Sequence, residues 1–84
     1  MKIVVINNGF VLVCRGYSQS PEGVTLTKAR CIRVWGTTEG LGQLVNGPTS
    51  DTVLDAMIPV VSVPLRQIVF TFDVVESAWD KALQ

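Results

Sequence analysis

The chain has 84 residues, with seven Lys and Arg against seven Asp and Glu, two cysteines and no histidine. This length allows one small domain, residues 1–84, and zero net charge argues against a duplex-DNA binder driven by bulk charge. The lack of histidine excludes histidine catalysis. With only two cysteines, a fold stabilised by a bound metal ion is not expected either, and we expect neither metal nor cofactor.

Apolar residues make up 48% of the chain and charged residues only 17%, against about 25% charged residues in typical soluble domains. A small domain cannot cover this much apolar surface by itself. We therefore expect a homo-oligomer, either a dimer or a tetramer.

A membrane span is not expected. The longest nearly uncharged run, Ile3–Cys14, is interrupted by Asn7–Gly9, whereas a spanning helix needs about 20 apolar residues. The same interruption does not fit a secretory signal. Without an export signal, Cys14 and Cys31 are expected to be free thiols used for packing.

The first strands form a hairpin. Lys2–Ile6 is a β-branched run, and Asn8-Gly9 is the commonest dipeptide of two-residue hairpin turns, so Phe10–Tyr17 is predicted to be the return strand. Both faces of that strand are mostly apolar, which predicts that it is covered on both sides. Ser18–Gly23 is predicted to be a loop.

Val24–Trp35 is rich in β-formers but too long for one flat strand. We expect a break near Thr27–Ala29 and a second strand over Arg30–Trp35. A period of two places Ile32 and Val34 on one face, toward the core, and places on the opposite face Cys31, Arg33 and Trp35.

A helix is predicted next, because Thr37 or Thr38 can act as its N-cap and Glu39 places an acid in the first turn. Asn46–Pro48 should stop it. A second helical turn around Asp51–Met57 is possible.

The C-terminal third combines two strands and a helix. Prolines at both ends of Pro59–Pro64 suit an edge strand, Gln67–Val75 alternates as a strand, and Glu76–Leu83 closes the chain as a short helix. The predicted fold is mainly β: a small antiparallel β-barrel or curled sheet of five to six strands with one or two short helices.

An enzyme is not expected. No histidine can activate either cysteine, and the acidic residues are better explained as caps or solvated surface. Phosphate-loop patterns are also absent, since no Gly-Lys-Ser/Thr follows Gly36–Gly42 and Gly40-Leu41-Gly42 lacks the third glycine of the dinucleotide fingerprint.

One stretch has the composition of a nucleotide pocket. No acid occurs from Val24 to Thr38, so its positive charge is locally unopposed. A guanidinium can bind phosphate, an indole can stack on a base, and a helix start accepts anions. The candidate ligand-binding residues are Lys28, Arg30, Arg33, Trp35, Thr37 and Thr38. The alternative is an amphipathic strand with solvated arginines and a tryptophan packed on a neighbour.

The same stretch resembles a widespread group of small phage-encoded proteins without an assigned function. The group carries Ala-Arg-Arg-Ile/Leu, aromatic residues, a Trp, then Gly and a Leu-x-Gln-Leu segment. The residues that carry the resemblance are Ala29–Gly36, Leu41, Gln43-Leu44 and Gly47, with Gly23–Leu26 and Ile68–Glu76 fitting the layout. The chain departs from the pattern at Cys31, Arg33 and Gly36-Thr37-Thr38.

The resemblance implies a phage protein acting in the host cytoplasm, similar to viral sponges that sequester the cyclic nucleotide signals of antiphage defence (anti-CBASS proteins). The function expected is therefore immune evasion by binding a nucleotide second messenger, such as a cyclic dinucleotide like cyclic GMP-AMP, without catalysis. Two alternatives are a protein–protein interaction module that inhibits a host enzyme and a minor structural phage protein.

Overall fold

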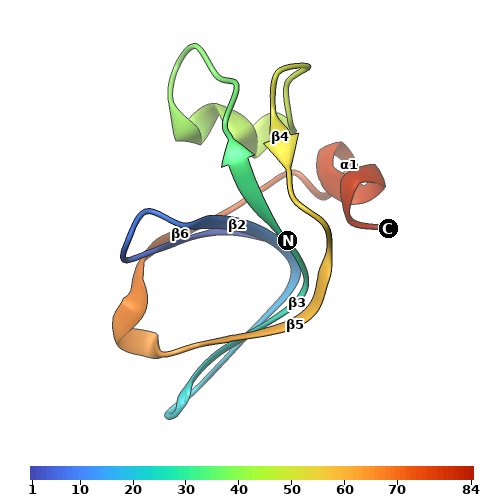
Figure 1. Ribbon diagram of the computed structural model, residues 1–84. Coiled ribbons are helices and arrows are strands. Elements are labelled where there is room, and N and C mark those ends of the chain that lie inside the picture. Colours follow the sequence, from blue (N-terminus) through green and yellow to red (C-terminus); the bar gives the residue numbers. More distant parts are fainter.

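The computed structural model describes residues 1–84 as one curled antiparallel sheet, with the helical turns at 41–46 and 76–83 on one side of it (Figure 1). The sheet has six strands and does not close into a barrel. The predicted mainly β fold is thus confirmed in its curled-sheet form. The strands are β1 Lys2–Ile6, β2 Val11–Ser20, β3 Gly23–Val34, β4 Val53–Leu54, β5 Ile58–Val63 and β6 Ile68–Asp73.

The long strand β3 organises the sheet. One edge of β3 pairs with β2. The other edge of β3 pairs with β5 in the first part of the strand and with β4 at its C-terminal end. On the far side of β2 follow β1 and then β6. Three strands, β4, β5 and β6, therefore lie at sheet edges, and the edge position predicted for the proline-flanked segment is confirmed for β5.

The first hairpin is as predicted, and the second is tighter. Asn8 and Gly9 both have positive φ, 80° and 83°, as expected for this dipeptide. The loop is Asn7–Gly9 rather than a two-residue turn, because Ile6 N–H donates to the carbonyl of Phe10 and Gly9 N–H donates to the carbonyl of Ile6. In the second hairpin, Ser20 pairs directly with Gly23. The predicted loop over Ser18–Gly23 is therefore wrong, because the strands continue up to a two-residue turn.

Strand β3 bends without breaking. Lys28 has a left-handed backbone, with φ of 49°, yet pairing with β2 continues on both sides of it. Farther along, the register with β4 shifts between Ile32 and Val34. As a result Ile32 is buried and Val34 is 47% exposed, so the prediction that both face the core is wrong for Val34.

The sheet is packed on both faces, which confirms the two-sided covering predicted for β2. One buried cluster lies between the sheet and the helical turns: Ile3, Val11, Val13, Ile32, Leu44, Val74, Trp79 and Leu83. The other lies inside the curl: Val4, Leu12, Cys14, Val24, Leu26, Ala29 and Val63. Alternate residues of β1 and β2 enter opposite clusters because successive side chains point to opposite faces of a strand.

The helical turns are short. The 3₁₀ helix η1 spans Leu41–Asn46 and another, η2, spans Leu65–Gln67, while the C-terminal helix predicted from the sequence is present as α1 Glu76–Trp79 continued by η3 Asp80–Leu83. The possible helical turn around Asp51–Met57 is absent, because this stretch contains β4. No helix of the chain is both long and apolar enough to cross a membrane.

Candidate functional site

The predicted site residues lie on the second half of β3 and on the loop that follows it, but they do not converge on one pocket. Lys28 is exposed at the bend of β3, where the register places it opposite Pro59 of β5. No ion pair holds its ammonium group. Lys28 does not border the hollow beside Arg33 that is described below.

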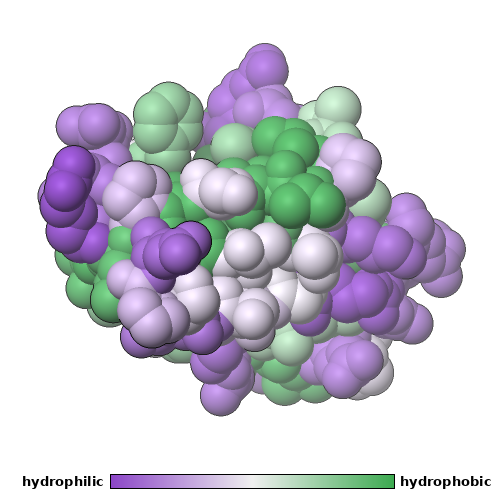
Figure 2. Space-filling model, turned by 90° about the horizontal axis from the view of Figure 1, so that it is seen from below, coloured by the Kyte–Doolittle hydropathy of each residue, from purple (hydrophilic) through white to green (hydrophobic).

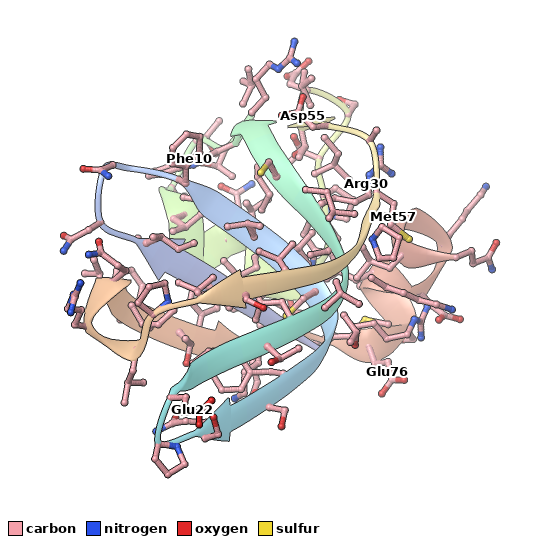
Figure 3. The ribbon with its side chains drawn as sticks, turned by 60° about the horizontal axis from the view of Figure 1, so that its bottom comes forward. Phe10, Glu22, Arg30, Asp55, Met57 and Glu76 are labelled. Atoms are coloured by element: carbon pink, nitrogen blue, oxygen red, sulfur yellow. The ribbon has the colours of Figure 1, made fainter.

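Arg30 is part of the framework. Its guanidinium donates to the backbone carbonyls of Asp55 at 2.6 Å, Ala82 at 3.0 Å and Leu54 at 3.5 Å. In Figure 3 it lies between the segment that joins β4 to β5 and the C-terminal helical turn. Because these donors are used within the chain, Arg30 is not placed to bind a phosphate.

Arg15, on the neighbouring strand β2, also binds the C-terminal turn. The sequence did not indicate this role. Arg15 donates to the Asp80 carboxylate at 2.6 Å and to the backbone carbonyl of Leu83 at 3.3 Å. Carbonyls in the last turn of a helix have no partners within that helix. Together with Arg30, Arg15 supplies those partners and fixes the C-terminal turn to the sheet.

Arg33 borders a shallow hollow at the end of β3. Its guanidinium lies 2.6 Å from the Asp55 carboxylate and is 70% exposed. Phe10, which is 61% exposed, lies across the end of β3 from Asp55 (Figure 3). The hollow has a volume of about 340 Å³ and is lined by Gly9, Phe10, Val11, Cys31, Ile32, Arg33 and Asp55.

Trp35 does not line this hollow. It follows the end of β3 and is 41% exposed. Val34 and Val53, which are directly paired between β3 and β4, are exposed to a similar extent. Val34, Trp35 and Val53 are exposed apolar residues at this end of the hairpin, which is called the β3–β4 tip below.

The predicted helix start at Thr37 or Thr38 is wrong. Helix η1 begins at Leu41 after Gly40, without a side-chain cap. The backbone N–H groups of Thr38 and Glu39 donate instead to Oε1 of Gln43, at 3.0 and 2.9 Å. A glutamine side chain thus takes the place that an anion would occupy, which leaves no anion-binding helix start here.

The loop 36–52 is held by further side-chain hydrogen bonds that sequence reasoning missed. Thr49 Oγ1 donates to the carbonyl of Gly36 at 2.6 Å, and Thr52 Oγ1 donates to the carbonyl of Trp35 at 2.7 Å. Gly36 has φ of 68°, and a Cβ there would overlap the backbone of Asp51 and Thr52. The two ends of the loop are therefore in direct contact.

The middle of the loop is anchored on the core. The indole Nε1 of buried Trp79 donates to the carbonyl of Leu44 at 2.7 Å, and Val75 N–H donates to the carbonyl of Val45 at 2.9 Å. Loops longer than about 12–15 residues with little secondary structure are uncommon in compact domains and are usually functional or disordered. This one is anchored at its ends and at its middle.

The two cysteines are free, as predicted. Desolvation raises the pKa of the buried Cys14 thiol, and desolvation together with the Asp55 carboxylate raises the pKa of Cys31. Only the thiolate is nucleophilic, so both side chains are poorly suited to nucleophilic chemistry at neutral pH.

Apolar side chains are also exposed elsewhere on the molecule. Figure 2, a view onto the side of the molecule that contains β5, shows apolar and neutral residues in the middle of the face and hydrophilic residues around its edge. Ile58 and Val60 of β5 are 41% and 59% exposed. A second open hollow, of about 360 Å³, lies beside the β2–β3 turn and is lined by Ser20, Glu22, Gly23, Val24, Thr25, Ser62, Val63 and Pro64.

Comparisons with known proteins identify no relative: no family model, no curated protein and no solved structure matches this chain.

Proposed function

We propose that this protein is a non-catalytic interaction module that recognises another protein through the β3–β4 tip and the loop 36–52. The observation that carries the proposal is the position of Trp35, an exposed indole at the start of a long loop that is hydrogen-bonded at both ends. The partner would have an apolar pocket that receives this side chain.

The energetics of binding favour such an arrangement. Residues that dominate binding energies are enriched in tryptophan, and ordering a mobile loop on binding costs free energy. The Thr49 and Thr52 hydroxyls already fix the loop ends in the free protein. Ordering of the loop ends therefore does not reduce the binding free energy that burial of the Trp35 indole supplies.

The proposal is tested by affinity purification of the tagged protein from the cells in which its gene is naturally expressed, compared with Trp35→Ala and a control, Val60→Ser. Val60 is more exposed than Trp35 but lies on β5, away from the tip. A partner retained by the wild type and the control, and lost from folded Trp35→Ala, is the expected result. Equal retention by all three proteins would contradict the proposal.

A nucleotide ligand is the second candidate, and it rests on the hollow beside Arg33. An exposed phenyl ring from Phe10 and an exposed guanidinium from Arg33 border the same space, and its volume is in the lower part of the range of small-molecule sites. A base would stack on Phe10, while a phosphate would replace Asp55 as the partner of Arg33. In this form the protein would be a phage-encoded sponge for a cyclic dinucleotide.

A thermal-shift screen with cyclic di- and trinucleotides and ADP-ribose derivatives tests the second candidate. A ligand that raises the melting temperature of the wild type, and no longer raises that of Arg33→Ala or Phe10→Ala, would support it. A shift that survives both substitutions would place the ligand elsewhere.

A further inference from the structure

Strand β6 has one side without a partner. It pairs with β1 alone, and Val69 and Phe70 are 54% and 49% exposed. Exposed sheet edges are usually protected by proline, lysine or a very short strand. Edge strand β5 carries Pro59, whereas β6, with the sequence Ile-Val-Phe-Thr-Phe-Asp, has neither proline nor lysine.

The register identifies which backbone groups face away from β1. Val74 N–H donates to the carbonyl of Met1, and the pairs Ile3–Phe72 and Val5–Phe70 follow in the same register. In an antiparallel ladder, every second pair is hydrogen-bonded, so Phe70 and Phe72 bond to β1. The N–H and C=O groups of Thr71 and Asp73 consequently point to the open side.

The centre of this edge is symmetric in sequence. Phe70, Thr71 and Phe72 read the same in both directions, and the two rings stack with centroids 6.2 Å apart. If two β6 strands pair antiparallel about a two-fold axis at Thr71, each Thr71 exchanges both backbone bonds with its counterpart. Phe70 of each copy then lies opposite Phe72 of the other, which is a favourable cross-strand pair.

Charge does not oppose this pairing. Asp73 is the one ionisable side chain on β6, and Lys2 of the same chain neutralises it at 2.6 Å. The β-bulge between Val5 and Ile6 shifts the register at Val69, which limits the regular contact to Phe70–Phe72. The edge therefore fits a short strand with the same sequence in the opposite direction.

We propose that a second copy of this chain binds along β6, so that two curled sheets join through antiparallel β6 strands centred on Thr71. The inference is independent of the function proposed for the β3–β4 tip, since the two surfaces use different strands. A β6 strand of a second copy satisfies the unpaired backbone groups of both Thr71 residues at once, as closed two-fold interfaces do.

Thr71→Pro is the most selective variant, because the N–H that proline removes does not bond to β1. Sedimentation velocity over a range of concentrations should show a dimer for the wild type and for the control Val60→Lys. For Thr71→Pro we expect the dimer to weaken by about tenfold or more, since two hydrogen bonds are lost. A wild-type protein that remains a monomer, or a Thr71→Pro dimer of unchanged affinity, would overturn the proposal.

Amide hydrogen exchange of the wild type tests the same contact without a substitution. The Thr71 amide has no acceptor within its own chain, so it should exchange rapidly in dilute solution and become protected as the concentration rises. Rapid exchange at every concentration would contradict the proposal, even if Thr71→Pro failed to fold.

Discussion

The Thr52 hydroxyl donates to the backbone carbonyl of Trp35 at 2.7 Å. The same oxygen accepts the Thr49 N–H at 2.8 Å. One side chain therefore joins the end of β3 to the start of β4 and fixes the backbone that presents the exposed indole.

Replacing Thr52 with valine removes the hydroxyl and keeps the shape of the side chain. The Thr49 N–H would lose its acceptor. We therefore expect the free energy of unfolding, measured by urea denaturation, to fall by about 1–3 kcal/mol. Thr52→Ser keeps the oxygen, so its free energy of unfolding should fall clearly less than that of Thr52→Val. Equal stability of the valine variant and the wild type would show that the loop does not depend on this contact.

Two arginines of β3 should respond very differently to substitution with methionine. Arg30 donates to backbone carbonyls of two distant segments, so Arg30→Met should lower the free energy of unfolding by about 1–3 kcal/mol. Arg33 makes an exposed ion pair with Asp55, and exposed pairs contribute at most about 1 kcal/mol. Denaturation curves in which Arg33→Met is the less stable variant would contradict these roles.

The two tryptophans provide a similar comparison. Trp79 is buried and its indole N–H bonds to the carbonyl of Leu44, whereas the Trp35 side chain is exposed. We expect Trp79→Phe to cost about 1–3 kcal/mol, because a buried hydrogen bond is lost and the smaller ring leaves a cavity, while the Leu44 carbonyl keeps the Gly47 N–H as its donor. Trp35→Phe should change stability by less than about 0.5 kcal/mol, as surface substitutions usually do. Thermal melts of the two variants measure the difference, and similar losses in both would contradict the assignment.

Cys14 gives a prediction for alkaline pH. Burial raises the pKa of its thiol above the ordinary value of 9.0, so in alkaline solution the unfolded chain loses this proton before the folded chain does. Its contribution to stability is complete below the ordinary pKa and decreases as the pH rises above it. The free energy of unfolding of Cys14→Ala should therefore fall less steeply than that of the wild type above about pH 9. Parallel curves would contradict the burial of this thiol.

Local signals in the sequence were sufficient for much of the fold. Asn8-Gly9 predicts the first hairpin because both residues accept positive φ, and the two apolar faces of β2 predict a strand covered on both sides. Prolines predict the edge position of β5. Each of these features depends on residues that are neighbours in the chain.

The candidate site depends on contacts between distant residues, and here the prediction from sequence was least successful. The one-residue shift at the end of β3 comes from its pairing with β4, so alternation along β3 alone could not show that Val34 is exposed. Arg30 bonds to carbonyls 25 and 52 residues away, which no local pattern indicates. Gln43 could be mistaken for an ordinary helix residue, although the glycines at 36, 40 and 42 mark an irregular loop.

The central claim, that Trp35 is the contact residue of a binding surface, is tested most directly by placing a photoreactive p-benzoylphenylalanine at position 35 and irradiating cells that express the protein. The account predicts one discrete covalent adduct with another protein from position 35, and none from the same group at Val60. Trp35 lies on the β3–β4 tip and Val60 on β5. Absence of an adduct from position 35, or the same adduct from both positions, would contradict it.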